Sequence, residues 1–301
     1  MEFLRKPPWL KKRIIPGPDI GNVSALLSEA RLHTVCQEAH CPNLPECFSR
    51  RTATFMIMGN ICTRNCRFCA VNHGTPAPLD EGEPERVASA SQQLGLRYVV
   101  VTSVTRDDLE DGGAHHFAKT AHAIKETGPG TSVELLVPDF RGNPSSLDII
   151  LSALPDVFNH NVETVPRLYP RVRPQAMYRR SLDLFQRVRS RNPSMLTKSG
   201  LMLGLGERKS EVIQVMEDLV NVGCRLLTLG QYLQPSREHH PVVRYLHPHE
   251  FEEYRALGER MGFTEVASGP FVRSSFNAAH MYRNALNLQK KNPPDHKTDT
   301  V

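Results

Sequence analysis

The chain has 301 residues, 40% hydrophobic and 23% charged, a composition that predicts a sizeable core and excludes collagen-like, coiled-coil and wholly disordered proteins. Lysine and arginine exceed aspartate and glutamate by 37 to 32, a formal charge of +5 that is too small to indicate nucleic-acid binding by itself. No apolar run reaches the ~18 residues of a membrane span, and no secretory signal or transit segment opens the chain, so we expect a cytoplasmic protein with no nucleic-acid and no membrane partner.

The N-terminal stretch is rich in proline and poor in periodic apolar runs, so we expect an irregular extension with one short helix around Ser24–Arg31. From Thr52 onward, short β-branched runs alternate with amphipathic stretches of helical period. The expected strands are Thr54–Met58, Tyr98–Ser103, Val133–Val137, Val157–Val162, Ser199–Leu203 and Leu226–Gln231. The expected helices are Pro84–Leu94, His115–Glu126, Ser145–Leu154, Arg179–Ser190, Ser210–Val222 and Pro248–Met261.

This alternation predicts an α/β fold with a parallel sheet of six strands. Polar residues follow several of the strands, at the ends where the sites of (β/α) barrels form. We therefore expect a partial (β/α)6 TIM-type barrel over residues 52–270, between an N-terminal extension (1–51) and a C-terminal extension (271–301). After the sixth strand, Glu265–Gly269 could form one more strand, Asn277–Gln289 is expected to be helical, and Lys290–Val301 is expected to be disordered.

Six of the seven cysteines lie within one short segment. An intracellular chain of this length does not need disulfides, so clustered thiols indicate metal binding. Cys62, Cys66 and Cys69 form a C-x3-C-x2-C loop directly after the first expected strand. Iron-sulfur clusters ordinarily take four thiolates, so three would leave one iron open to a substrate or cofactor. A zinc site is less well matched, because its C-x2-C pairs are usually completed by a second pair.

An earlier triplet, Cys36, Cys41 and Cys47, has C-x4-C-x5-C spacing and predicts a second three-thiol cluster site. His40 lies between two of these cysteines and is a weaker candidate ligand. Cys224 lies where a helix meets a strand and is expected to be a small core residue without chemistry.

The C-x3-C-x2-C loop, with Phe68 before its last cysteine, resembles the motif of the radical S-adenosylmethionine (SAM) enzymes. The two triplets in this order and spacing resemble the lipoyl synthase family in particular, and the likeness runs from about Ile15 to Phe276. The matching segments are Glu38–Asn43, Cys62–Cys66, Thr102–Ala114, Asn159–Tyr169, Lys198–Glu207, Gly230–Pro235 and Arg273–Ser275. The family usually has tyrosine where this chain has Phe276.

The resemblance implies two 4Fe-4S clusters and SAM as cofactors. One cluster binds SAM and cleaves it to a 5′-deoxyadenosyl radical, and the second, auxiliary cluster is consumed as the sulfur donor. The implied ligands are Cys62, Cys66 and Cys69 for the first cluster, and Cys36, Cys41, Cys47 and Ser275 for the second, with Ser274 as the alternative fourth ligand. Without the resemblance, either serine would be read as a helix cap. We further expect Asn161, Glu163, Gly204 and Gly206 to lie near SAM.

The implied reaction inserts two sulfur atoms at C6 and C8 of an octanoyl chain attached to a lysine of a lipoyl carrier domain. The implied partners are octanoylated carrier domains (2-oxoacid dehydrogenase E2 subunits or the glycine cleavage H protein), an electron donor such as ferredoxin or flavodoxin, and an iron-sulfur carrier protein. Four arginines could balance the cluster charge or bind the methionine carboxylate, or simply be solvated: Arg64, Arg67, Arg106 and Arg273.

Two other functions stay open on the sequence. One is a different sulfur-inserting radical SAM enzyme, of the biotin synthase type, which does not account for the N-terminal triplet Cys36, Cys41 and Cys47. The other is a non-catalytic iron-sulfur or zinc-binding protein, which would not react with SAM and leaves the polar strand ends unexplained.

Overall fold

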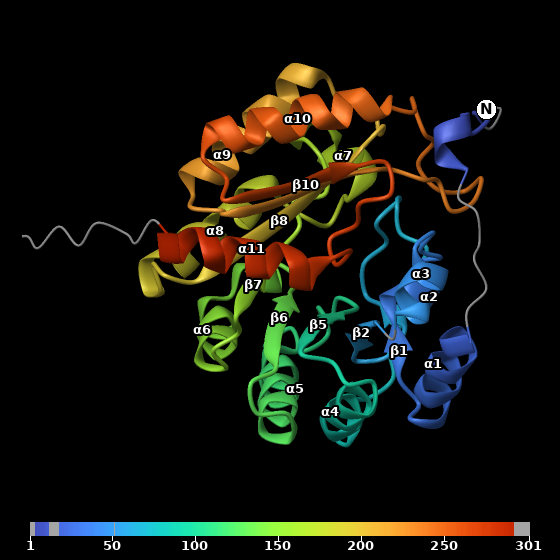
Figure 1. Ribbon diagram of the computed structural model, residues 1–301, viewed down its shortest axis with the longest axis vertical. Helices are drawn as coiled ribbons and strands as arrows, with labels where there is room; N and C mark the ends of the chain where they lie inside the picture. The colour runs from blue at the N-terminus through green and yellow to red at the C-terminus, as the bar shows by residue number, and fades with distance from the viewer. Residues whose placement is uncertain (1–3, 12–17, 51, 292–301) are drawn as a thin grey trace, which may run out of the picture.

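The computed structural model describes residues 4–11, 18–50 and 52–291 (Figure 1). One curved sheet carries eight strands in the order β1-β2-β5-β6-β7-β8-β9-β10, and every neighbouring pair is parallel except β1 with β2. Its strands are β1 (His33–Thr34), β2 (Thr54–Ile57), β5 (Tyr98–Ser103), β6 (Ser132–Leu136), β7 (Val157–Asn159), β8 (Leu196–Leu203), β9 (Leu226–Gln231) and β10 (Glu265–Gly269). A separate short parallel pair joins β3 (Ile61–Cys62) to β4 (Asn72–His73).

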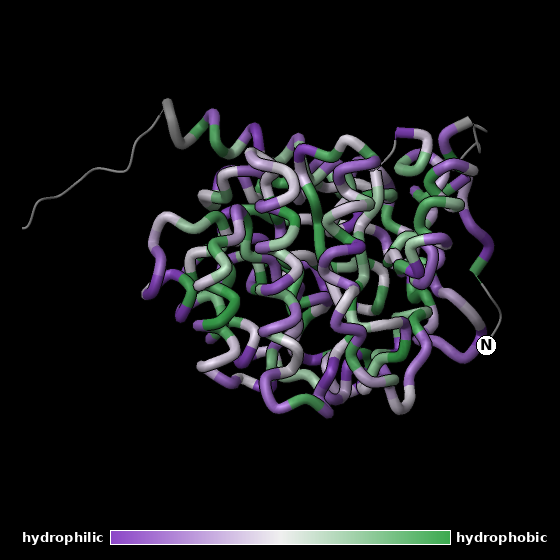
Figure 2. The backbone as a smooth tube through the Cα atoms, turned by 90° about the horizontal axis from the view of Figure 1, so that it is seen from below, coloured by the Kyte–Doolittle hydropathy of each residue, from purple (hydrophilic) through white to green (hydrophobic). Residues whose placement is uncertain are grey.

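Helices on the outer side of the sheet connect the parallel strands (Figure 1). They are α4 (Glu83–Gln93), α5 (Ala114–Thr127), α6 (Pro144–Ser152), α8 (Tyr178–Arg191), α9 (Lys209–Asn221) and α10 (Pro248–Met261), each within two residues of its expected bounds; a short α7 (Tyr169–Val172) precedes α8. Each outer helix buries one face, as in α9, where Val212, Val215, Met216 and Leu219 recur at helical spacing and pack on the core. Hydrophobic segments run through the middle of the molecule, and many peripheral loops are hydrophilic (Figure 2).

The expected α/β class and partial barrel are confirmed, because all six expected strands stand side by side in chain order and β1 and β10 leave the sheet open. The count of six parallel strands is one too low, and the additional strand is Glu265–Gly269, which the sequence offers as one more strand; as β10 it pairs in parallel with β9 along five residues. Only Val266 of β10 is fully buried, as is typical of an edge strand, and its apolar signal in the sequence is correspondingly weak.

The N-terminal extension is more regular than expected. Besides β1 it holds α1 (Pro18–Glu29), α2 (Val35–Glu38) and α3 (Leu44–Ser49), where the sequence predicts one short helix. Proline is favourable in the first turn of a helix, which explains why α1 already begins at Pro18. The extension is attached to the barrel by the pairing of β1 with β2 and by Trp9, whose Nε1 donates to the carbonyl of Leu246 at 3.1 Å.

The C-terminal extension crosses the barrel before its helix, α11 (Ala278–Lys291). A Cβ atom on Gly230 of β9 would lie 2.1 Å from the carbonyl oxygen of Val272, so glycine is needed for this segment to pass. Helix α11 then packs Met281 and Ala285 against the N-terminal ends of β7, β8 and β9. Of the segment expected to be disordered, Lys290 and Lys291 belong to α11, and residues 292–301 lie outside the described residues.

Within the part of the chain that the structure describes, no helix is long and apolar enough to span a membrane.

Candidate functional site

A cavity of about 950 Å³ lies inside the curved sheet. Strands β2, β5, β6, β8 and β9 contribute lining residues, as do both extensions. Nine of the residues expected from the sequence line it: Cys36, Cys41, Cys47, Cys62, Cys66, Cys69, Asn161, Glu163 and Ser275. Gly204 and Gly206 are not among the lining residues.

Backbone contacts fix the loop that carries Cys62, Cys66 and Cys69. The Sγ atom of Cys62 accepts hydrogen bonds from the amides of Arg64 at 3.4 Å and Thr105 at 3.3 Å. Further along the loop, the amide of Arg67 donates to the carbonyl of Val172 at 2.8 Å. The segment after β5 and the end of α7 therefore anchor this loop.

Burial makes three of these thiols, those of Cys36, Cys66 and Cys69, poor acids. Desolvation raises the pKa of Cys66 to about 11, with Arg173 opposing the shift, and raises the pKa of Cys69 to about 12. Burial also raises the pKa of Cys36 to about 11, although hydrogen bonds from Thr54 oppose it. Thiolates at these positions therefore need a bound cation, and iron would supply one.

The triplet Cys36, Cys41 and Cys47 is held by the two short helices of the N-terminal extension. Cys36 lies in α2 and Cys47 in α3, and the amide of Cys41 between them donates to the carbonyl of Cys36 at 3.0 Å. The side chain of Asn43 then donates to the carbonyl of Phe271 at 2.7 Å. This contact joins the N-terminal extension to the C-terminal extension beside the cavity.

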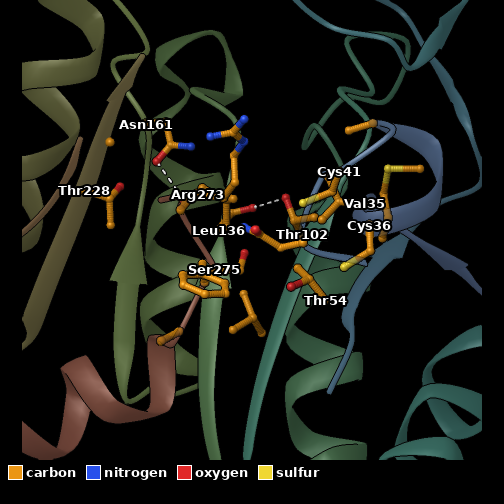
Figure 3. A pocket seen from close by; sticks show the side chains of 18 of the residues that line it. Val35, Cys36, Cys41, Thr54, Thr102, Leu136, Asn161, Thr228, Arg273 and Ser275 are labelled. Carbon is orange, nitrogen blue, oxygen red and sulfur yellow. Dashed lines mark hydrogen bonds between the residues drawn. The ribbon is translucent and has the colours of Figure 1, made fainter. Parts of the chain in front are cut away.

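The two adjacent serines of the C-terminal extension have different surroundings. The hydroxyl of Ser274 donates to Oδ1 of Asn161 at 3.1 Å and accepts from Nδ2 of Asn159 at 3.4 Å. Ser275 lies across the cavity from Cys36 and Cys41 (Figure 3), and no described residue hydrogen-bonds to its hydroxyl. Because α11 begins only at Ala278, neither serine directly precedes the helix as a cap would.

The donor set is chemically suited to iron-sulfur clusters, whose usual ligands are cysteine thiolates. All seven cysteines are free thiols, and six of them surround one cavity. Among the described residues, no three His, Cys, Asp or Glu side chains are close enough to hold one metal ion. The thiolates of a four-iron cluster bind separate irons and stay apart, whereas zinc ligands converge on one point.

A buried cation that the sequence analysis did not single out lies beside Glu163. Arg173 lines the cavity, and its Nη1 donates to the carbonyls of Asn161 at 3.0 Å and Val162 at 3.1 Å, while its Nε is buried without a partner in the described structure. Burial raises the pKa of Glu163, although Arg173 opposes the shift. Several arginines follow β7, and nothing in the sequence distinguishes the buried one.

Gly204 and Gly206, which the sequence analysis expects near SAM, belong to a turn that the side chain of Glu207 closes outside the cavity lining. The carboxylate of Glu207 accepts from the amides of Gly204 at 2.6 Å and Leu205 at 2.9 Å. A Cβ atom on Gly204 would lie 2.5 Å from the carbonyl oxygen of Arg244. Glycine at position 204 allows this close packing, and the amides of Gly204 and Leu205 are bonded to Glu207.

Arg64 and Arg106 have partners inside the protein, as do the carboxylates that they bind. Arg64 binds Asp107 and Asp139, each at 2.6 Å, and Arg106 binds Asp108 at 2.8 Å. Burial alone would raise the pKa of Asp139, yet its hydrogen bond from Arg64 holds that pKa well below the usual range. Of the four arginines for which the sequence left open a role at the clusters or simple solvation, only Arg273 lines the cavity.

Comparisons with known proteins match most of the chain. The family model of the radical SAM superfamily matches residues 56–219. A lipoyl synthase of Caldanaerobacter subterraneus subsp. tengcongensis is 60% identical over 275 residues, which cover 91% of this chain and 96% of the relative. A lipoyl synthase of Methylococcus capsulatus is 57% identical over 276 residues, which cover 91% of this chain and 86% of the relative.

Solved structures share the fold at low sequence identity. Methylornithine synthase superimposes with a TM-score of 0.56 at 12% identity, over 89% of this chain and 80% of that one. The FeFe-hydrogenase maturase HydG of Carboxydothermus hydrogenoformans superimposes with a TM-score of 0.57 at 16% identity, over 77% of this chain and 56% of that one. With relatives of this identity and coverage, and a family model that spans more than half of its length, the chain belongs to the lipoyl synthase family of the radical SAM superfamily.

Proposed function

We propose that the chain inserts two sulfur atoms, at C6 and C8, into an octanoyl chain attached to a lysine of a lipoyl carrier domain, using SAM and two 4Fe-4S clusters. The observation that carries this proposal is that both cysteine triplets line one cavity. A radical and a sulfur source can then act on the same bound chain. Membership of the lipoyl synthase family supports the same reaction.

The six cysteines and one serine have distinct roles in this proposal. Cys62, Cys66 and Cys69 hold the cluster that binds SAM, and Cys36, Cys41 and Cys47 hold the auxiliary cluster with Ser275 as its fourth ligand. When bound, SAM and the reduced cluster supply the radical needed to break an unactivated C–H bond, which no side-chain acid or base can do.

The rest of the cavity suits the organic reactants. Met56, Val100 and Leu136 from neighbouring strands give it an apolar wall that can hold an alkyl chain and exclude water. Asn161, Glu163 and the buried Arg173 form the polar part, and we assign them to SAM, whose amino and carboxylate groups need partners of opposite charge. Gly204 and Gly206 contribute through the turn that Glu207 closes after β8.

The division of the chain follows these roles. Residues 1–51 supply the auxiliary-cluster thiols, residues 52–270 form the radical SAM barrel, and residues 271–301 supply the serine. The carrier substrates are 2-oxoacid dehydrogenase E2 subunits or the glycine cleavage H protein. The proposed partners are ferredoxin or flavodoxin as electron donor and an iron-sulfur carrier protein to rebuild the auxiliary cluster. A cytoplasmic location stays a prediction from the sequence.

The direct test is mass spectrometry of an octanoyl-lysyl peptide after anaerobic incubation with reconstituted protein, SAM and a reductant. We expect the peptide to gain two sulfur atoms and lose two hydrogen atoms, with 5′-deoxyadenosine formed. If 5′-deoxyadenosine forms and the peptide keeps its mass, the substrate assignment is wrong. If a protein with both clusters loaded yields neither product, a non-catalytic iron-sulfur role replaces the proposal.

A serine variant tests the fourth auxiliary ligand. Ser275→Ala is expected to lower the iron content from about eight atoms per chain toward about four, because a cluster held by three thiolates alone is more easily lost. Ser275→Cys is the matched control, since a thiolate can replace the alkoxide as ligand and should keep about eight. Iron analysis and the absorbance of the reconstituted proteins would report both. A fully loaded alanine variant that still inserts both sulfur atoms would exclude Ser275 as a ligand.

A further inference from the structure

The cavity has an exposed rim around the N-terminal end of β5. Arg97 directly precedes this strand, and Arg283 follows Tyr282 on α11. The rings of Tyr98 and Tyr282 lie 5.2 Å apart, so the two arginines flank one contact between β5 and α11. All four of these residues line the cavity.

The N-terminal extension completes the rim. Thr54 of β2 is opposite Val100 of β5, so the chain just before Thr54 lies beside the start of β5. Arg50, at the end of α3, and Thr52 both line the cavity from this side. The rim is therefore formed by α3, the start of β5 and the first turns of α11.

The rim is positively charged. Among the described residues, the exposed side chains of permanent charge that line the cavity are all arginines: Arg50, Arg97 and Arg283. Arg50 pairs with the half-buried Glu46 at 3.1 Å. The guanidinium groups of Arg97 and Arg283 make no hydrogen bond or ion pair with any described residue. Two unpaired guanidinium groups beside one opening suit carboxylates, which they can bind through two parallel hydrogen bonds.

We propose that this rim is the docking site of the octanoylated carrier domain, which meets Arg97 and Arg283 with carboxylates on the surface around its modified lysine. The inference rests on the proposed function, because a folded domain cannot enter a cavity of about 950 Å³ and must stay at its edge while the lysine arm reaches inside. The apolar wall formed by Val100 and Leu136 continues inward from the rim and would receive the alkyl chain. Opposite charges at the edge of an interface mainly raise the rate of association and set its orientation.

The test compares two substrates of the same chemistry: an octanoylated carrier domain and a short, uncharged octanoyl-lysyl peptide. For the variant Arg97→Glu/Arg283→Glu, we expect kcat/KM on the carrier domain to fall about tenfold or more at low salt, because two attractive charges become repulsive. The peptide should be converted at the wild-type rate, since it does not reach the rim charges. The matched control is Arg187→Glu/Arg260→Glu, which makes the same charge change at exposed positions away from the cavity.

Binding provides a second readout that does not depend on turnover. Fluorescence anisotropy with labelled carrier domain should show weaker binding to the rim variant than to the control variant, and the difference should shrink as salt is added. Equal carrier kinetics and binding for the two variants would overturn the docking site. An equal loss of kcat/KM on the carrier domain and on the peptide would also overturn it, because the arginines would then affect the reaction or the fold. If the wild-type protein converts neither substrate, the proposed function itself is wrong. That result is distinct from failure of the docking site, which is seen only when the variants are compared.

Discussion

Cys66→Ala is expected to abolish both 5′-deoxyadenosine formation and sulfur insertion, whereas Cys41→Ala is expected to abolish sulfur insertion alone. The reason is the division of labour between the two thiol sets that share the cavity. Cys66 belongs to the loop that leaves one iron open for SAM, and Cys41 belongs to the set that holds the sulfur donor. Each variant should keep about four iron atoms per chain instead of about eight, since one of the two clusters is retained.

The measurement combines iron analysis with chromatography of 5′-deoxyadenosine and mass spectrometry of the peptide. Cys224→Ala is the matched control, because Cys224 is a buried free thiol outside the cavity and its loss should leave both products unchanged. If Cys41→Ala also stops the formation of 5′-deoxyadenosine, the two thiol sets do not hold independent clusters. If Cys66→Ala still cleaves SAM, the C-x3-C-x2-C loop is not the SAM-binding set.

The parts of the fold that the sequence predicts best are those where local pattern and tertiary environment agree. β5 and β9 have their expected bounds because both are short apolar runs buried on both faces. β8 begins at Leu196, three residues earlier than expected, because Thr197 and Lys198 are polar yet buried. β7 ends at Asn159 and not at Val162, because the chain turns out of the sheet toward Glu163, whose φ is +64°.

The site shows the same contrast between local and distant information. The cysteine spacing predicts two thiol sets, since each set lies on one short segment. Their arrangement around one cavity depends on contacts that no local pattern contains, such as that of Ser274 with Asn161 across 113 positions of the chain. The rim arginines were not predicted for a related reason. An arginine without a partner and an arginine in an ion pair look the same in a sequence.

Lys198→Met is expected to lower the free energy of unfolding by about 3–5 kcal/mol, because it leaves a buried carboxylate without its counterion. The Nζ atom of Lys198 lies 3.0 Å from Oε1 of Glu134, and the two side chains are only 1% and 0% exposed. Glu134 also accepts hydrogen bonds from Nδ2 of Asn159 at 2.7 Å and from the hydroxyl of Tyr98 at 2.5 Å. Denaturant unfolding of variant and wild type, both in the same state of cluster loading, measures the difference.

The double variant Glu134→Leu/Lys198→Met separates the ion pair from the packing around it. Removing both charges should lower the free energy of unfolding by less than either single change does, since no unpaired charge stays buried. If the single and double variants lose the same free energy of unfolding, the two side chains stabilise the fold through their packing volume and not through their charges. Asn159 also donates to Ser274, the neighbour of the proposed cluster ligand. Glu134 therefore holds the amide that contacts the serine segment, so the single variant Glu134→Leu should lose auxiliary-cluster iron as well as stability.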